Sequence, residues 1–208
     1  RAVSSITEFI REANTHSENL VGRPMQPINF IVIADRDRLI AMFLAAGWHQ
    51  ADIPNVHNFF KLYSTIVKDT QYPAGPLTPA FYDSRTNDLG FEKETTKATS
   101  RQRHHTRYWD SGFRLQGTTV WVATASFDEG IWIGSDIKLP THKIDPDIDS
   151  EREFIFNDLQ ATGLIAESHK VPVVPPEQGT NAAGDPFTTD GRAYVIILRS
   201  RSIDKIYQ

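Results

Sequence analysis

The chain contains no cysteine, which excludes disulfide bonds, thiolate metal sites and cysteine nucleophiles. It has no apolar run approaching about 18 residues, so it supplies no membrane-spanning helix of its own. Basic charge is not in excess either, because 22 Lys and Arg stand against 26 Asp and Glu, for a formal net charge of −4. No overall positive field therefore attracts nucleic acid, and we expect no nucleic-acid partner.

Well-known catalytic motifs are also missing. The sequence has no G-x-S-x-G turn, no H-E-x-x-H pair, no phosphate-binding P-loop and no G-x-G-x-x-G. Ser, His and Asp are abundant, but nothing in their spacing selects a serine triad. The chain begins at Arg1 without a signal-peptide pattern, so we expect a fragment or a processed form.

A length of 208 residues with 39% hydrophobic content fits one globular domain. Apolar periodicity and capping residues predict four helices, two of them with capping-box spacing at Ser5/Glu8 and Ser150/Glu153. Asp35 is expected to cap the second helix and Gly47 to end it. The predicted helices are Ser5–Ala13, Arg36–Ala46, Val56–Val67 and Ser150–Ala161.

Strands are expected mainly after Pro79. The nearly continuous apolar run Ile28–Ala34 predicts a strand buried on both faces. A turn is expected at Asp128–Gly130 and a long loop at Pro175–Gly191. The other predicted strands are Ala80–Tyr82, Leu89–Lys93, His104–Trp109, Thr118–Ser126, Ile131–Ile133, Val171–Val174 and Arg192–Arg199.

Because helices precede a run of strands, the predicted fold class is α+β. We expect a single domain with a mostly antiparallel sheet of five to seven strands, covered by about three helices. Residues 1–25 would form an N-terminal helix and linker, loosely attached to the domain at residues 26–208.

The segment Arg101–Asp110, RQRHHTRYWD, is the first candidate site. Successive side chains of a strand point to opposite faces, so His105 and Arg107 would share one face and His104 would occupy the other. An imidazole beside a guanidinium suits an anionic ligand such as a phosphate or carboxylate, and it makes His105 and Arg107 candidate catalytic residues. The alternative is a solvated or partner-covered sheet face with no chemistry.

A second candidate lies at Thr141–Asp149, THKIDPDID. Its D-x-D-x-D spacing matches the first half of a calcium loop, but Ser150 and Phe156 occupy the positions where an EF-hand needs Gly and Glu. The candidate metal ligands are His142, Asp145, Asp147 and Asp149, with His142 also a candidate catalytic base. The alternative interpretation is capping and turn chemistry at the start of the following helix.

The overlapping segment Ile144–Glu153 carries a net charge of −4 and Arg101–Asp110 one of +2, and these opposite signs favour contact of the two segments as an ion-pair network. The same contact could hold one divalent metal ion, which is the only cofactor that the sequence suggests. Carboxylate ligands would favour Mg²⁺, Ca²⁺ or Mn²⁺, whereas two imidazoles and one carboxylate would allow Zn²⁺ or Fe²⁺.

Seven segments in this order resemble the LssY C-terminal domain family. The similarity spans roughly Gln26–Arg199. The segments are PINFIVIAD at Pro27–Asp35, AAGWHQAD at Ala45–Asp52, YPAGPLTPAFYDSR at Tyr72–Arg85, DLGFEKE at Asp88–Glu94, RQRHHTRYW at Arg101–Trp109, HKIDPDIDSERE at His142–Glu153 and DLQATG at Asp158–Gly163.

The resemblance implies a setting rather than a reaction. Such domains are described at the C-terminal end of bacterial membrane proteins, beside phosphatidic-acid-phosphatase-like or DedA-like segments. It therefore implies a soluble domain with a membrane-associated place in a bacterial cell, and the membrane segments of its own full-length protein as partner. It supplies no catalytic residues.

Two functions remain open. The first is a ligand-binding or regulatory module of a bacterial envelope protein, with a small anionic ligand. The second is a metal-assisted hydrolase acting on phosphate-containing or lipid-derived substrates, with His105 or His142 as base, Asp145 or Asp147 as ligand and Arg107 as anion clamp. Convergence of these residues on one cleft would favour the enzyme.

Overall fold

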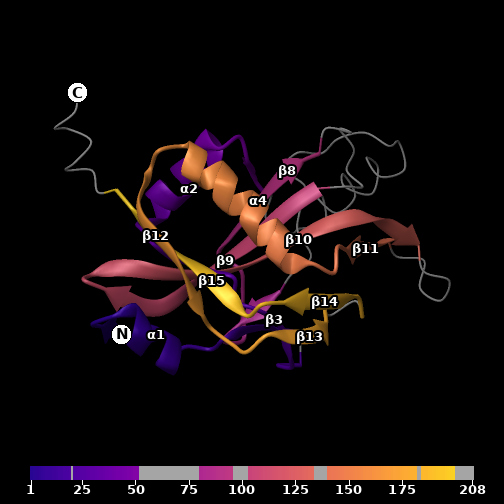
Figure 1. Cartoon of the computed structure of the whole chain (residues 1–208), viewed down its shortest axis with the longest axis horizontal. Coiled ribbons are helices and arrows are strands. Elements are labelled where there is room, and N and C mark those ends of the chain that lie inside the picture. Colours follow the sequence, from indigo (N-terminus) through magenta and orange to yellow (C-terminus); the bar gives the residue numbers. More distant parts are fainter. Residues whose placement is uncertain (20, 52–79, 96–102, 134–139, 182–183, 200–208) are drawn as a thin grey trace.

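Two long antiparallel strands, β9 (Arg103–Leu115) and β10 (Thr118–Ile133), form the centre of the fold in the computed structural model (Figure 1). The structure describes residues 1–19, 21–51, 80–95, 103–133, 140–181 and 184–199, with the backbone alone over 128–133 and 140–143. Around the hairpin, the described strands make a nine-stranded sheet in the order β12-β15-β4-β10-β9-β8-β5, with β1 beside β9 and β11 beside β10.

The predicted α+β domain with a mostly antiparallel sheet is confirmed, although the sheet is larger than five to seven strands. Two of its strand pairs are parallel, β15 with β4 and β1 with β9. The remaining members are β1 (Ala2–Val3), β4 (Phe30–Ile33), β5 (His49–Gln50), β8 (Leu89–Glu94), β11 (Pro140–Ile144), β12 (Ile165–Pro172) and β15 (Arg192–Leu198). Smaller sheets are built from β2 (His16–Glu18), β3 (Pro24–Pro27), β6 (Phe81–Tyr82) and β7 (Arg85–Thr86), and from β13 (Glu177–Thr180) with β14 (Pro186–Thr189).

The side chains of β4 point alternately to the two faces of the sheet, and each face is covered by its own core. Phe30 and Val32 face a core formed with α2 (Arg36–Ala45) and α4 (Ile148–Ala161), the two helices that cross one face in Figure 1. Ile31 and Ile33 face a second core, to which α1 (Ile6–Glu12) and the small sheet of β2 and β6 contribute. A strand that is buried on both faces needs apolar residues throughout, as its sequence predicts.

The start of α4 differs from the prediction. Ser150 was expected to cap a helix over Ser150–Ala161, but the helix begins at Ile148 with Asp147 as its N-cap. The Asp147 carboxylate accepts hydrogen bonds from the amides of Asp149 and Ser150, and the Ser150 hydroxyl donates to it as well. Ser150 therefore lies in the first turn and donates hydrogen bonds to the N-cap residue. Its hydroxyl does not cap the helix.

The N-terminal helix is bound more firmly than expected. Ser5 caps α1 as predicted, because its hydroxyl accepts a hydrogen bond from the Glu8 amide. Phe9 is only 2% exposed and meets the ring of Phe113 edge to face at 5.3 Å. Since β1 also pairs with β9, the expectation of loose attachment is wrong.

Two segments that were predicted as a turn and a loop contain strands. The expected turn at Asp128–Gly130 lies inside β10, where a β-bulge shifts the pairing with β11. The expected loop Pro175–Gly191 contains the β13–β14 hairpin. The predicted helix Val56–Val67 lies outside the described residues. None of the described helices is long and apolar enough to cross a membrane.

Candidate functional site

Strand β9 separates its two histidines, as the alternation of side chains predicts. Tyr108 belongs to the core beneath α2 and α4, whereas Trp109 belongs to the core on the other face. His104 therefore faces α4, and His105 with Arg107 faces away from it. The two predicted catalytic residues on this strand share a face.

On that face His105 is hydrogen-bonded to a serine that sequence analysis did not single out. The Nε2 atom of His105 lies 2.9 Å from the hydroxyl of Ser126 on β10, and 3.4 Å from Nη1 of Arg107. His105 is 4% exposed and Ser126 is 3% exposed, while Arg107 is only partly buried. Arg107 is thus the most exposed member of this group.

A buried ion pair completes the group. Nη1 of Arg103 lies 2.7 Å from Oε2 of Glu92 on β8, and the two side chains are 4% and 2% exposed. Glu92 stands directly opposite His105 in the strand register. We call these residues, together with Thr124 opposite Arg107, the β9 cluster: Glu92, Arg103, His105, Arg107, Thr124 and Ser126.

The sequence of β10 contains a signal for Thr124 and Ser126, which sequence analysis did not single out. Its face toward α2 and α4 stays apolar, with Trp121, Ala123 and Ala125. Its other face changes from Val120 and Val122 to Thr124 and Ser126, and all four are buried. Polar residues at buried positions of a strand are uncommon and mark functional candidates. That change, read with the pairing of β9 and β10, would have identified Ser126.

His104, on the opposite face, joins the two segments that were expected to meet. Its Nδ1 atom lies 2.8 Å from Oε2 of Glu151 in the first turn of α4. Its ring stacks on Phe154 at 3.8 Å and contacts Phe127 at 4.7 Å. The Glu151 side chain is only 3% exposed. The predicted contact between the segments therefore exists, as a buried pair that holds α4 on the sheet.

The three predicted metal-binding aspartates are used at the start of α4. Asp145 accepts a hydrogen bond from the amide of Asp147 at 2.9 Å, which is a turn interaction. Asp147 is the N-cap. Asp149 accepts from the hydroxyl of Thr189 at 2.7 Å and from the amide of Asp190 at 2.6 Å.

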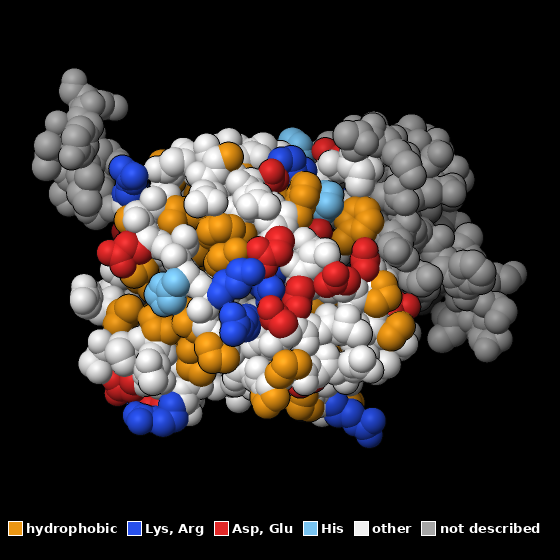
Figure 2. Space-filling view, viewed as in Figure 1, with side chains coloured by type: hydrophobic (Ala, Val, Ile, Leu, Met, Phe, Trp, Pro, Cys, Tyr) orange, Lys and Arg blue, Asp and Glu red, His pale blue; other side chains and the backbone are white. Residues whose placement is uncertain are grey.

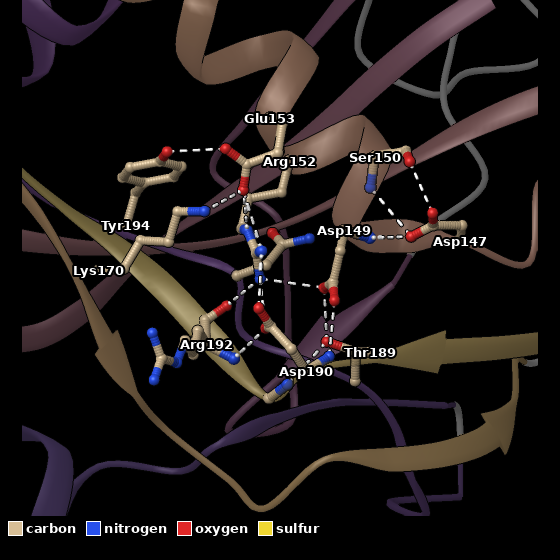
Figure 3. A network of polar contacts seen from close by, with 12 residues as sticks. Asp147, Asp149, Ser150, Arg152, Glu153, Lys170, Thr189, Asp190, Arg192 and Tyr194 are labelled. Carbon is tan, nitrogen blue, oxygen red and sulfur yellow. Dashed lines mark hydrogen bonds and ion pairs between the residues drawn. The ribbon is translucent and has the colours of Figure 1, made fainter.

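Arg152 is the centre of a network of polar contacts, drawn in Figure 3. Its side chain is 2% exposed and donates to the carboxylates of Asp149, Glu153 and Asp190. Nη1 also lies 2.7 Å from the carbonyl oxygen of Arg192. Glu153 in turn accepts from Lys170 at 2.6 Å and from the Tyr194 hydroxyl at 2.8 Å. We call this set the Arg152 network: Asp149, Arg152, Glu153, Lys170, Thr189, Asp190, Arg192 and Tyr194.

Contacts within the Arg152 network lower the pKa values of two of its carboxylates, Glu153 and Asp190. Burial alone would raise the pKa of Glu153, but hydrogen bonds from Lys170 and Tyr194 outweigh it and the pKa is lowered. Burial opposes the hydrogen bond from Arg152 in the same way at Asp190, whose pKa is also lowered. Figure 2 shows basic side chains bordered by acidic ones on the face that carries α4.

The described residues do not form the predicted metal site. The backbone places His142 in β11 opposite Ile131, and its side chain lies outside the described residues. Within the described ranges, no three His, Asp or Glu side chains gather closely enough to hold a metal ion. The structure thus brings His105 and Arg107 together on the face away from α4, and it places the aspartates at the first turn of that helix.

The comparisons with known proteins identify a family. The model of the family described as LssY C-terminus matches residues 10–193, which is most of the chain. Searches of curated proteins and of solved structures each returned no match. The match begins earlier than the Gln26 expected from sequence and includes part of α1. The chain belongs to the LssY C-terminal domain family.

Proposed function

We propose that this domain is a binding module for a small ligand with a carboxylate or phosphate group, and that the β9 cluster is its site. The observation that carries the proposal is the position of Arg107. Its guanidinium lies 3.4 Å from the imidazole of His105, which is itself bonded to the buried hydroxyl of Ser126. Guanidinium, imidazolium and hydroxyl groups are the donors that bind planar or tetrahedral anions.

The burial of the cluster supports a functional role over a structural one. Its side chains lie on strands β8, β9 and β10, which backbone hydrogen bonds already hold together. Leu, Val or Ile at these positions would stabilise the face without the cost of desolvating charge. Charged groups that are buried where architecture does not need them are candidates for ligand recognition.

The setting implied by the family suggests what such binding is for. If the domain follows membrane segments in a bacterial envelope protein, ligand binding here would regulate those segments, which are then its natural partner. This part of the proposal is supported by the family membership alone.

A hydrolase is the second candidate, and the hydrogen bond between Ser126 and His105 is the observation that favours it. The described aspartates support a structural use at the start of α4, so this candidate does not depend on them. A nucleophile and base at the same cluster would act on the ligand that Arg107 binds.

Isothermal titration of the domain with inorganic phosphate tests the binding proposal. Arg107→Gln removes the charge-assisted hydrogen bonds, which contribute about 1.5–3 kcal/mol, so we expect binding to weaken by at least about tenfold. Arg114→Gln is the matched control, because Arg114 lies on the same strand and pairs with Asp110. It should leave affinity unchanged. Equal binding by wild type and Arg107→Gln would overturn the proposal.

A further inference from the structure

A carboxylate, an imidazole and a hydroxyl lie in one row across three neighbouring strands. Glu92 on β8 is directly opposite His105 on β9, and His105 is directly opposite Ser126 on β10. Residues that are opposite on neighbouring strands share a face and have Cβ atoms about 4.5–5.5 Å apart. The sheet register thus places the three groups in the order that nucleophilic hydrolases use.

We infer the protonation of His105 from its contacts. A guanidinium has no acceptor, so the Nη1 atom of Arg107 can only donate to Nε2 of His105. In the neutral ring Nε2 therefore carries the lone pair and Nδ1 carries the proton. The hydroxyl of Ser126, 2.9 Å from the same Nε2, must then be a donor as well. This is the arrangement in which a histidine takes the proton of a serine.

Other buried hydroxyls on the described strands are used differently. Those of Ser17, Thr106 and Ser111 each donate to a backbone carbonyl oxygen. Such bonds satisfy a buried polar group and have no chemical consequence. The hydroxyl of Ser126 instead meets a base, and the base stands beside a cation.

We propose that Ser126 is a nucleophile for carboxylic esters that carry an anionic group, with His105 as general base and Glu92 as a positioning residue. The substrate class rests on the proposed function, because Arg107 is the group that would hold the anionic part. Arg107 is adjacent to the reacting atoms, so it would also stabilise negative charge on the ester oxygen during attack.

The reaction balances without a metal or a second reactant other than water. The Ser126 oxygen forms a bond to the ester carbonyl carbon as its proton passes to Nε2 of His105. The bond from that carbon to the leaving oxygen breaks, and the leaving alcohol takes the proton from Nε2. Water then attacks the acyl group on Ser126, giving one proton to His105, and the serine recovers that proton as the acid departs.

Glu92 would act through His105 and not on the substrate. Its carboxylate is placed by the bond to Arg103 at 2.7 Å, on the strand next to His105. A carboxylate on the strand beside an imidazole stabilises by its charge the imidazolium that forms when Nε2 takes a proton. Glu92→Gln should therefore shift the midpoint of the pH–rate profile, which a purely structural role would not do.

Reaction with a fluorophosphonate probe, followed by mapping of the adduct by mass spectrometry, tests the nucleophile. We expect one adduct, on Ser126, in the wild-type domain. His105→Gln should slow labelling by at least about 100-fold. Ser111→Ala is the matched control, since Ser111 is a buried serine on β9, and it should label normally.

The outcomes separate the two proposals. Absence of an adduct, or an adduct elsewhere, in a domain that still binds inorganic phosphate would overturn the nucleophile and leave the binding module intact. An adduct on Ser126 without phosphate binding would support the nucleophile and overturn the proposed ligand class. Mapping uses the wild-type chain, so it does not depend on the folding of a variant. Faster hydrolysis of mono-4-nitrophenyl glutarate than of 4-nitrophenyl acetate, reversed in Arg107→Gln, would support the anionic substrate class.

Discussion

The Arg152 network and the β9 cluster are both built from buried charged and polar groups, but they connect different things. The network joins the helix α4 to the strands β12 and β15 and to the turn at Asp190. The cluster joins β8, β9 and β10, which already share backbone hydrogen bonds. We infer that contacts of the first kind hold the fold together, and we propose that those of the second kind serve ligand binding. The distinction predicts which substitutions unfold the protein and which disable it.

The largest effect is expected from Arg152→Met. Removing one partner of a buried ion pair leaves carboxylates without compensation, which costs about 3–5 kcal/mol. The free energy of unfolding, measured by urea denaturation, should fall by about that amount. Arg192→Met is the matched control, because Arg192 contributes only its backbone atoms to the network and its side chain is exposed. It should change stability by less than about 0.5 kcal/mol. Similar values for the two variants would refute the structural role of the network.

Acid should weaken the polar contacts of α4, in the Arg152 network and at the helix cap. Glu153, Asp190 and Asp147 have lowered pKa values in the folded chain. Each therefore contributes stability that is present above its unfolded pKa of about 4 and is lost as the pH falls through the folded value. The stability of the wild type should decline below about pH 5. In Arg152→Met the decline should be shallower, because two of these carboxylates lose their partner, and in Arg107→Gln it should match the wild type.

A helix cap gives a smaller, matched test. Asp147 and Asp35 both occupy N-cap positions, but only Asp147 makes side-chain hydrogen bonds to its helix. Asp147→Ala should cost about 1 kcal/mol and Asp35→Ala close to nothing. Thermal unfolding of the two variants side by side measures the difference. If Asp147→Ala also removed a bound metal from purified protein, the metal-ligand prediction for this aspartate would be restored.

The smallest change in stability is expected in the β9 cluster. Arg107→Gln should unfold within about 1 kcal/mol of the wild type, because the three strands remain joined by their backbones. The same variant should lose phosphate binding. A large loss of stability in urea would place Arg107 in the architecture and weaken the comparison.

Local sequence signals predicted much of the fold. Ser5, the apolar run of β4 and Gly47 after α2 each act within a few residues, and each lies where it was expected. The misses have a common cause. The edge strand β12 is mostly exposed and polar, and the β13–β14 hairpin is rich in turn residues, so neither has an apolar pattern. Only tertiary pairing makes them strands.

The candidate site was half predictable for the same reason. His105 and Arg107 are two residues apart on one strand, and alternation alone puts them together. Ser126 and Glu92 come from other strands, and their approach depends on a register that the sequence does not state. The aspartates near Asp147 were predicted both as ligands and as caps. The bonds of Asp147 are those of a helix start, because the first amide N–H groups of α4 have no acceptor within the helix and donate to its carboxylate.

The most direct test of the account is an NMR titration of ¹⁵N-labelled domain with inorganic phosphate. The account predicts that amide shifts concentrate on β9 and β10 around His105, Arg107 and Ser126, and disappear in Arg107→Gln. Shifts centred on the first turn of α4, around Asp147 and Arg152, would contradict it by exchanging the roles of the two regions. A spectrum that phosphate leaves unchanged would contradict the anion site altogether.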